Sequence, residues 1–167
     1  RTGFDRNYWI WEEYDPTKRY LIAADVARGD GQDHSAFHVM DVDNLDIVAE
    51  YQGKLTIDLF AKFLFDASKE YGKPLLVVEN NNIGYSVLEK LIDFGYDNVY
   101  YSTKGSGQYV DSLVAETMSN AIPGFATSQK SRPLIIAKLE EFIRNKLIKI
   151  RSKRIINELR TFVWHNG

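Results

Sequence analysis

Two apolar runs that each end in an acidic residue constrain the fold of this chain more than any other feature. Residues 20–26 (YLIAADV) contain Asp25 near their end, and residues 74–79 (PLLVVE) end in Glu79. A short, nearly continuous apolar run is typical of a strand that is buried on both faces of a sheet. Both runs are therefore predicted to be central strands, each with a carboxylate at its carboxyl end.

The segment between these runs predicts two more strands and a helix. Residues 34–42 and 46–52 have the composition of strands and flank an Asp-Asn turn, so a three-strand meander is expected. Residues 56–71 carry apolar residues at helical spacing, with Thr56 placed to cap the start and Gly72 to end the helix.

The remaining elements are predicted from shorter patterns. Helices are expected over residues 83–94, 133–145 and 153–164, and short strands over residues 98–101 and 146–151. Residues 102–129 show little periodicity and are expected to be mostly irregular, with a short helix over residues 110–118.

This order of elements predicts an α/β fold with a mixed sheet in strand order 3-2-1-4-5 and helices on both faces. That is the ribonuclease-H-like arrangement. In it the strands at residues 20–26 and 74–79 lie side by side and parallel, so their carboxyl ends meet at one edge of the sheet. Asp25 and Glu79 are then about one strand spacing apart, on the order of 5 Å.

Two carboxylates at this spacing repel each other unless a proton or a divalent cation lies between them. Mg²⁺ takes one or two protein carboxylates and keeps waters for a substrate phosphate. A pair of such ions, about 4 Å apart, supports phosphodiester hydrolysis. Asp25 and Glu79 are therefore candidate metal ligands and catalytic acids, and the alternative is that both are ordinary solvated strand-end acids. The sequence has no G-x-x-x-x-G-K-[ST] motif, which argues against nucleotide hydrolysis by this chain.

Composition narrows the function classes further. The 167 residues are 44% hydrophobic and 26% charged, which suffices for one compact domain with its own core. The lack of cysteine excludes disulfides, a thiolate zinc site and a cysteine nucleophile. No apolar run approaches the roughly 18 residues of a membrane span.

Residues 1–19, which are rich in aromatic and charged side chains, are expected to be a linker from a preceding domain, with the folded domain over residues 20–167.

The charge distribution is asymmetric although the formal net charge is only −2. Residues 1–103 carry 10 basic and 18 acidic side chains, whereas residues 104–167 carry 11 basic and 5 acidic ones. The second half is therefore a candidate polyanion-binding surface, and the alternative is an ordinary solvated face. The candidate DNA-binding residues are Lys104, Lys130, Arg132, Lys149, Arg151, Lys153 and Arg154.

The chain resembles the C-terminal nuclease domain of the large terminase subunit of tailed bacteriophages of the T-even type. The matching segments are residues 21–42 (LIAADVARGDGQDHSAFHVMDV), 75–91 (LLVVENNNIGYSVLEKL) and, more weakly, 139–150 and 158–167. The resemblance covers nearly the whole chain. It rests on a D-x-x-x-G motif after the first strand and an E-x-N-x-x-G motif after the fourth.

The resemblance implies a metal-dependent endonuclease, using Mg²⁺ or Mn²⁺ in a pair of ions, that cuts concatemeric double-stranded viral DNA with little sequence preference. It also implies action in the host cytoplasm, an ATPase domain on the same polypeptide, and the portal and small terminase subunit as partners. Asp25 and Glu79 match the family's first and second catalytic acids. Asp33 matches a further acidic position and is interpreted with them as a metal ligand, although a turn acid that caps backbone amides is an equal alternative.

The family's third acid lies in an Asp-Asp motif shortly after the stretch that corresponds to residues 158–167. This sequence ends before such a motif, so the domain is expected to be truncated at its C-terminus, and Asp111 and Glu116 are weak substitutes. His34 and His38 are interpreted as partly buried strand residues rather than zinc ligands, because no third ligand lies near them.

Two other functions remain open. The chain could be another ribonuclease-H-like nuclease, such as a resolvase, integrase or transposase, with the same acids but a different DNA substrate. It could also be a non-catalytic module that docks DNA or another subunit and keeps an incomplete set of acids. Cleavage of plasmid DNA in Mg²⁺ or Mn²⁺ separates the enzymes from the docking module.

Overall fold

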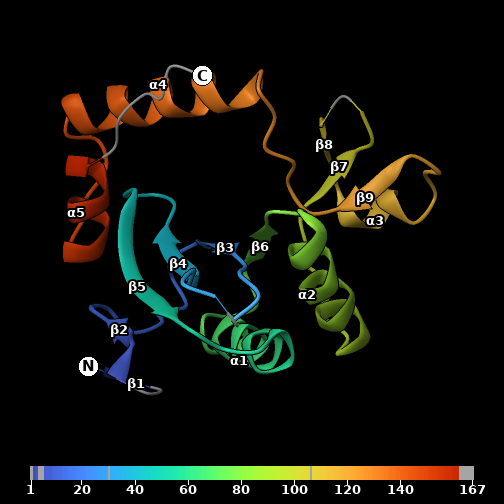
Figure 1. Cartoon of the computed structure of the whole chain (residues 1–167), viewed down its shortest axis with the longest axis horizontal. Helices are drawn as coiled ribbons and strands as arrows, with labels where there is room; N and C mark the ends of the chain where they lie inside the picture. The colour runs from blue at the N-terminus through green and yellow to red at the C-terminus, as the bar shows by residue number, and fades with distance from the viewer. Residues whose placement is uncertain (1, 4–5, 30, 106, 162–167) are drawn as a thin grey trace.

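The structure is a computed structural model, and it describes residues 2–3, 6–29, 31–105 and 107–161. A six-stranded mixed sheet lies at its centre in the order β1-β2-β5-β4-β3-β6 (Figure 1). Its strands are β1 (Thr2–Gly3), β2 (Tyr8–Ile10), β3 (Tyr20–Asp25), β4 (Ser35–Asp41), β5 (Asp46–Gly53) and β6 (Leu75–Val78). Only β3 and β6 are parallel among these pairings. The predicted fold class is confirmed, because β5-β4-β3-β6 reproduces the predicted order of the four long strands.

One face of this sheet carries the apolar core. Helices α1 (Ile57–Glu70) and α2 (Asn82–Asp93) contact each other and bury their apolar sides in the same cluster as the strands. Along β4 the alternation of side chains sends Phe37 and Val39, both fully buried, into this core. Ala36 and His38 point to the opposite face, which is the face that carries the polar residues considered below.

The N-terminal segment differs from the expectation of a linker. Strand β2 pairs antiparallel with β5, and Tyr8 lies opposite Tyr51. The side chains of Tyr8 and Ile10 are 3% and 4% exposed and belong to the core. The described part of residues 1–19 is therefore part of the folded domain, because burying these two side chains requires the edge of the sheet that β5 provides.

The stretch expected to be irregular contains a second, three-stranded sheet in the order β8-β7-β9. Its elements are β7 (Tyr101–Thr103), β8 (Tyr109–Val110), α3 (Ser112–Ala115) and β9 (Ala121–Pro123). The predicted fifth strand, residues 98–101, is reduced to one parallel bridge between Val99 and Leu76, since the chain turns into this second sheet. A further bridge joins Glu79 to Phe125 and ties the second sheet to the edge of the first.

Two helices end the described chain, α4 (Ser131–Arg144) and α5 (Lys153–Thr161). The strand expected over residues 146–151 is wrong: the segment makes one bridge, from Lys149 to Asp46, because Lys146 adopts φ +55° and turns the chain away after α4. Residues 162–164 of the expected last helix lie outside the described residues. No described helix is long and apolar enough to cross a membrane.

Candidate functional site

The two strand-end carboxylates lie at neighbouring positions of the sheet. In the parallel pairing of β3 and β6, Ala24 lies opposite Val78, and the N–H of Glu79 donates to the carbonyl oxygen of Ala24 over 3.2 Å. Asp25 is the last residue of β3, and Glu79 directly follows β6. The register therefore places the two acids side by side, as the predicted topology requires.

The pKa of Asp25 is raised because its carboxyl lies close to other acids and is partly buried. Partial burial of its carboxyl raises the pKa of Asp25, and repulsion from Glu79 and from Asp33 raises it further, although a hydrogen bond from the N–H of Val26 acts in the opposite direction. Carboxylates held together in this way favour a divalent cation with oxygen ligands. The donor set fits Mg²⁺ or Mn²⁺ by its chemistry, because it consists of carboxylate oxygens alone.

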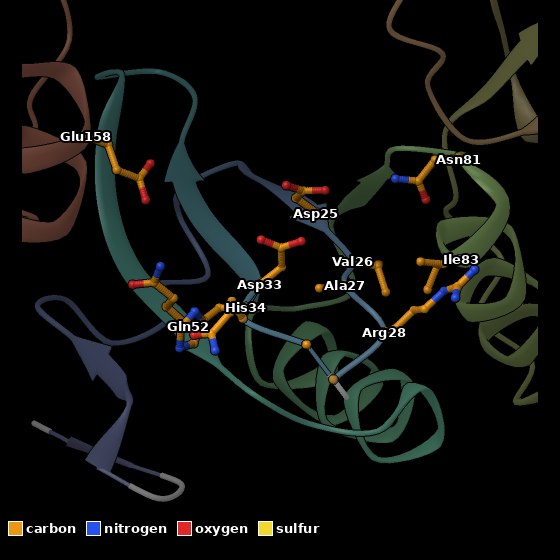
Figure 2. Close-up of a pocket in the computed structure, with 13 residues that line it drawn as sticks. Asp25, Val26, Ala27, Arg28, Asp33, His34, Gln52, Asn81, Ile83 and Glu158 are labelled. Carbon is orange, nitrogen blue, oxygen red and sulfur yellow. The ribbon is translucent and has the colours of Figure 1, made fainter. Parts of the chain in front are cut away.

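The acids line an open groove on the polar face of the sheet (Figure 2). One cavity of about 620 Å³ reaches from Asp25 to Asp33, and an adjoining cavity of about 380 Å³ contains Asp25 and Glu79. We call the combined space the acidic groove. Its charged and polar lining residues include Asp25, Arg28, Asp33, His34, Glu79, Arg154 and Glu158.

The glycines of the two sequence motifs allow backbone segments to pass close to the acids. At Gly84 a Cβ atom would lie 1.8 Å from the carbonyl oxygen of Glu79, so only glycine lets the first turn of α2 approach this strand end. At Gly29, where φ is +82°, a Cβ atom would lie 2.3 Å from the carbonyl oxygen of Leu55. The conformation of both loops therefore depends on the motif glycines.

The asparagine of the E-x-N-x-x-G motif has a structural role. The side chain of Asn81 accepts a hydrogen bond from the N–H of Gly84 over 2.8 Å and caps α2. The motif therefore joins three functions in six residues: the acid Glu79, the cap of the next helix and the close approach of that helix to the acid.

Asp33 and His34 line the acidic groove, and His38 contacts Glu50 within the sheet. In Figure 2 the carboxylate of Asp33 points toward Asp25, and its charge contributes to the raised pKa of Asp25. His34 precedes β4 and lines the acidic groove. His38 lies within β4, partly buried, with Nε2 3.0 Å from Oε1 of Glu50.

Neither weak substitute for the third acid lies in the groove. Asp111 caps the short helix α3 by accepting a hydrogen bond from the N–H of Leu113 over 2.9 Å, and Glu116 follows that helix. Among the described residues, no three His, Asp or Glu side chains are close enough to hold one metal ion. A further acid, Glu158 on α5, does line the groove, and it borders both cavities together with Asp25.

Glu158 is a groove residue that no sequence pattern predicted. Figure 2 shows its carboxylate directed into the groove from the side opposite β6. Arg28, on the loop after β3, was not predicted either, and it lines the same cavity as Asp25. The D-x-x-x-G motif could have indicated Arg28, which lies inside it, but no local pattern distinguishes Glu158 from any other exposed helical acid.

The predicted DNA-binding residues divide into two groups. Lys104, Lys130, Arg132 and Lys153 are exposed and make no ion pair with the described residues. Lys149 is 62% exposed and lies 4.0 Å from a carboxylate oxygen of Asp46.

Arg151 and Arg154, unlike these exposed cations, form ion pairs with acids of the domain. Arg151 Nη2 lies 2.9 Å from Glu12 Oε1 and 2.9 Å from Asp46 Oδ2. Arg154 lies 3.6 Å from Glu50 Oε2 and stacks on the ring of Trp9. Paired and partly buried guanidinium groups are poor ligands for a DNA phosphate, since binding would require breaking these contacts first.

No protein-family model matches this sequence. Its fold is similar to that of the large terminase nuclease from thermophilic phage G20c. The crystal structure of that nuclease with bound magnesium has a TM-score of 0.74 and 22% sequence identity, over 100% of this chain and 75% of the other. The structure with bound zinc has a TM-score of 0.70 and 22% identity, over 98% and 80%.

The large terminase nuclease domain of Thermus phage P74-26 is similar as well, with a TM-score of 0.69 and 22% identity over 99% of this chain and 75% of that chain. The similarity therefore extends over nearly the whole chain, including both ends of the described sheet. It confirms the expected resemblance at the level of the fold.

Proposed function

We propose that this chain is the nuclease domain of a large terminase subunit, and that it hydrolyses phosphodiester bonds of double-stranded DNA with the help of divalent metal ions. The observation that carries the proposal is the parallel pairing of β3 and β6, which brings Asp25 and Glu79 together in an open groove. The structural neighbours with bound magnesium and zinc share this fold and support the same function.

Asp25, Glu79 and Asp33 would hold Mg²⁺ or Mn²⁺, in a pair of ions. When bound, such ions lower the pKa of an attacking water and stabilise the charge on the leaving oxygen. The fold positions the three carboxylates that would hold these ions. The sheet fixes Asp25 and Glu79, and the turn before β4 brings Asp33 to them. Arg28, which lines the same cavity as Asp25, is available to pair with a DNA phosphate.

The bound DNA would lie along the acidic groove and extend over the second sheet. Phe125 pairs with the end of β6, and both Phe125 and Thr127 line the groove. The exposed cations Lys130 and Arg132 follow a few residues later. Contacts from such side chains to phosphates give affinity without sequence information, which suits a nuclease with little sequence preference.

The biological setting of the proposal comes from the family resemblance. The substrate would be concatemeric viral DNA that is cut during genome packaging in the host cytoplasm. The partners would be the portal, the small terminase subunit and an ATPase domain on the same polypeptide.

Plasmid cleavage tests the proposed activity. We expect nicking and linearisation of supercoiled plasmid in Mg²⁺ or Mn²⁺, cleavage of linear duplex at scattered positions, and no cleavage in excess EDTA. A strong preference for four-way junctions would instead indicate a resolvase. DNA binding without cleavage in any divalent metal would indicate a docking module.

A triple variant tests the proposed DNA path. Replacing Lys104, Lys130 and Arg132 with Gln should weaken binding of linear duplex in Ca²⁺. Each cation that neutralises a DNA phosphate releases condensed counterions, and the variant loses this favourable release. The slope of log K against log salt should flatten by about one unit for each phosphate that is no longer neutralised. The affinity should fall equally for duplexes of unrelated sequence.

A control triple variant removes the same charge from the opposite face of the domain. Lys62, Lys69 and Lys73 lie on α1 or just after it, on the side of the sheet that carries the core. Their replacement by Gln should leave the salt slope unchanged. An unchanged slope for the first triple variant as well would show that DNA does not contact the cations beside the second sheet and at the start of α4.

A further inference from the structure

A buried acid on the polar face of the sheet holds the start of α5. Glu50, on β5, is only 1% exposed, and its Oε1 accepts a hydrogen bond from the hydroxyl of Ser152 over 2.6 Å. Its Oε2 lies 3.6 Å from Nη1 of Arg154. A buried carboxylate needs such partners, because an unpaired charge would be costly at this depth.

The same contacts join α5 to the N-terminal segment. The guanidinium group of Arg154 lies 3.5 Å from the centre of the Trp9 ring, and Nη1 donates to the carbonyl oxygen of Asn7 over 3.2 Å. Ser152 also accepts a hydrogen bond from the N–H of Ile155 and so caps the first turn of α5. We call Trp9, Glu50, Ser152 and Arg154 the α5 latch.

The latch contributes to the orientation of α5, whose own residues lie outside the apolar core. None of its nine described residues is buried. A helix of this length is not stable alone in water, so its position depends on contacts with other parts of the chain. The polar contacts of the latch are concentrated in its first turn and reach two other parts of the chain, β5 and the N-terminal segment.

Arg154 and Glu158 lie on the same side of this helix. Residues four positions apart are neighbours on a helix surface. Both side chains line the cavity that contains Asp25 and Glu79. Holding Arg154 against Glu50 and Trp9 therefore also sets the direction in which Glu158 points.

We propose that Arg154 is a positioning residue that acts through Glu158: the latch turns Glu158 toward the Asp25 and Glu79 pair, and this additional carboxylate raises the affinity of the acidic groove for divalent cations. The proposal rests on the proposed metal-dependent function. It assigns Arg154 a role in shaping the metal site in place of a contact with DNA. It also makes the N-terminal segment, through Trp9, a support of the site.

The affinity for Mn²⁺, measured from the EPR signal of the free ion, tests the proposal without relying on activity. Arg154→Gln should weaken Mn²⁺ binding about tenfold, as expected for a residue that orients a metal-site group. Glu158→Gln should weaken it by a similar factor. The double variant should bind Mn²⁺ no more weakly than Glu158→Gln alone, since Arg154 acts through the carboxylate that is already missing.

Arg19→Gln provides the matched control. Arg19 is an exposed guanidinium that pairs with Asp43, far along the sheet from the groove. It should leave the Mn²⁺ affinity unchanged in both the wild-type and the Glu158→Gln background. A second variant, Trp9→Ala, keeps every charge of the latch and should still weaken Mn²⁺ binding severalfold.

Two results would overturn the proposal. One is an unchanged Mn²⁺ affinity in both Arg154→Gln and Trp9→Ala. The other is a further drop in affinity by the same factor when Arg154→Gln is added to Glu158→Gln, which would show independent action. Failure of the proposed function looks different, because then Asp25→Asn would also leave Mn²⁺ binding unchanged.

Discussion

The Asp25→Asn variant should lose metal-dependent cleavage of plasmid DNA while it remains folded. Asparagine keeps the shape of the side chain but removes the charge that would hold the metal ion. Metal ions contribute several kcal/mol of transition-state stabilisation, so the rate should fall by about a thousandfold. The initial rate of nicking in Mg²⁺ and in Mn²⁺ measures this loss, and Glu79→Gln should behave alike.

The same variant has an expected effect on stability that depends on pH. The pKa of Asp25 is raised above its ordinary value of 3.8 by partial burial and by Glu79, so its ionised form destabilises the metal-free folded state. This cost is present above the raised pKa and disappears as the pH falls below the pKa of the unfolded chain. Asp25→Asn should therefore leave the metal-free Tm equal or higher at pH 7, with no gain below about pH 4.

Asp43→Asn is the matched control for this pair of measurements. Asp43 is an exposed acid that pairs with Arg19 at the distant turn after β4, so its loss should change neither the nicking rate nor the response to metal. Nicking by Asp25→Asn within twofold of the wild type would contradict the assigned site. A clear drop in metal-free Tm for both Asp25→Asn and Glu79→Gln would indicate that the two acids serve the fold.

The second large effect is expected at Gly84, a residue that has no side chain and takes no direct part in the proposed reaction. The added methyl group of Gly84→Ala would lie 1.8 Å from the carbonyl oxygen of Glu79, so the start of α2 or the end of β6 must shift. Overpacking of this kind costs about 1–3 kcal/mol of stability. A displacement of the acid by even about 1 Å can cost about a hundredfold in rate, which the plasmid assay would detect.

Gly31→Ala separates the clash from a general effect of removing a glycine. Gly31 also borders the acidic groove, but an added Cβ atom meets nothing within 4 Å, and its backbone is not in the left-handed region. Its Tm should stay within about 1 °C of the wild type or rise slightly, because alanine lowers the entropy of the unfolded chain. Equal Tm values for Gly84→Ala and Gly31→Ala would show that the contact at Glu79 relaxes without cost.

The pairing of Asp25 with Glu79 could be predicted from the sequence because each local pattern has one structural meaning. An apolar run bounded by turn residues indicates a buried strand, and right-handed crossovers leave few orders in which such strands can lie. The E-x-N-x-x-G motif also has a local explanation, since Asn81 caps the helix that Gly84 allows to approach Glu79.

The contacts of the last helix could not be predicted in the same way. Arg154 contacts Asn7 across 147 residues of sequence, and Arg151 contacts Glu12 across 139. A basic side chain in a sequence is equally consistent with a DNA phosphate, an internal carboxylate or solvent. The charge asymmetry of the chain therefore does not by itself show which of its cations pair with acids inside the domain, as Arg151 and Arg154 do.

The sequence by itself determined which strands form the centre of the sheet and which two acids end them, because strand burial and chain connectivity depend on nearest neighbours and handedness. Only the tertiary structure decided that the N-terminal residues extend the sheet, that Arg151 and Arg154 are paired inside the domain, and that Glu158 faces the groove. The physical reason is that an ion pair or the rotation of a short helix depends on groups distant in sequence, whose meeting is a property of the whole packed fold.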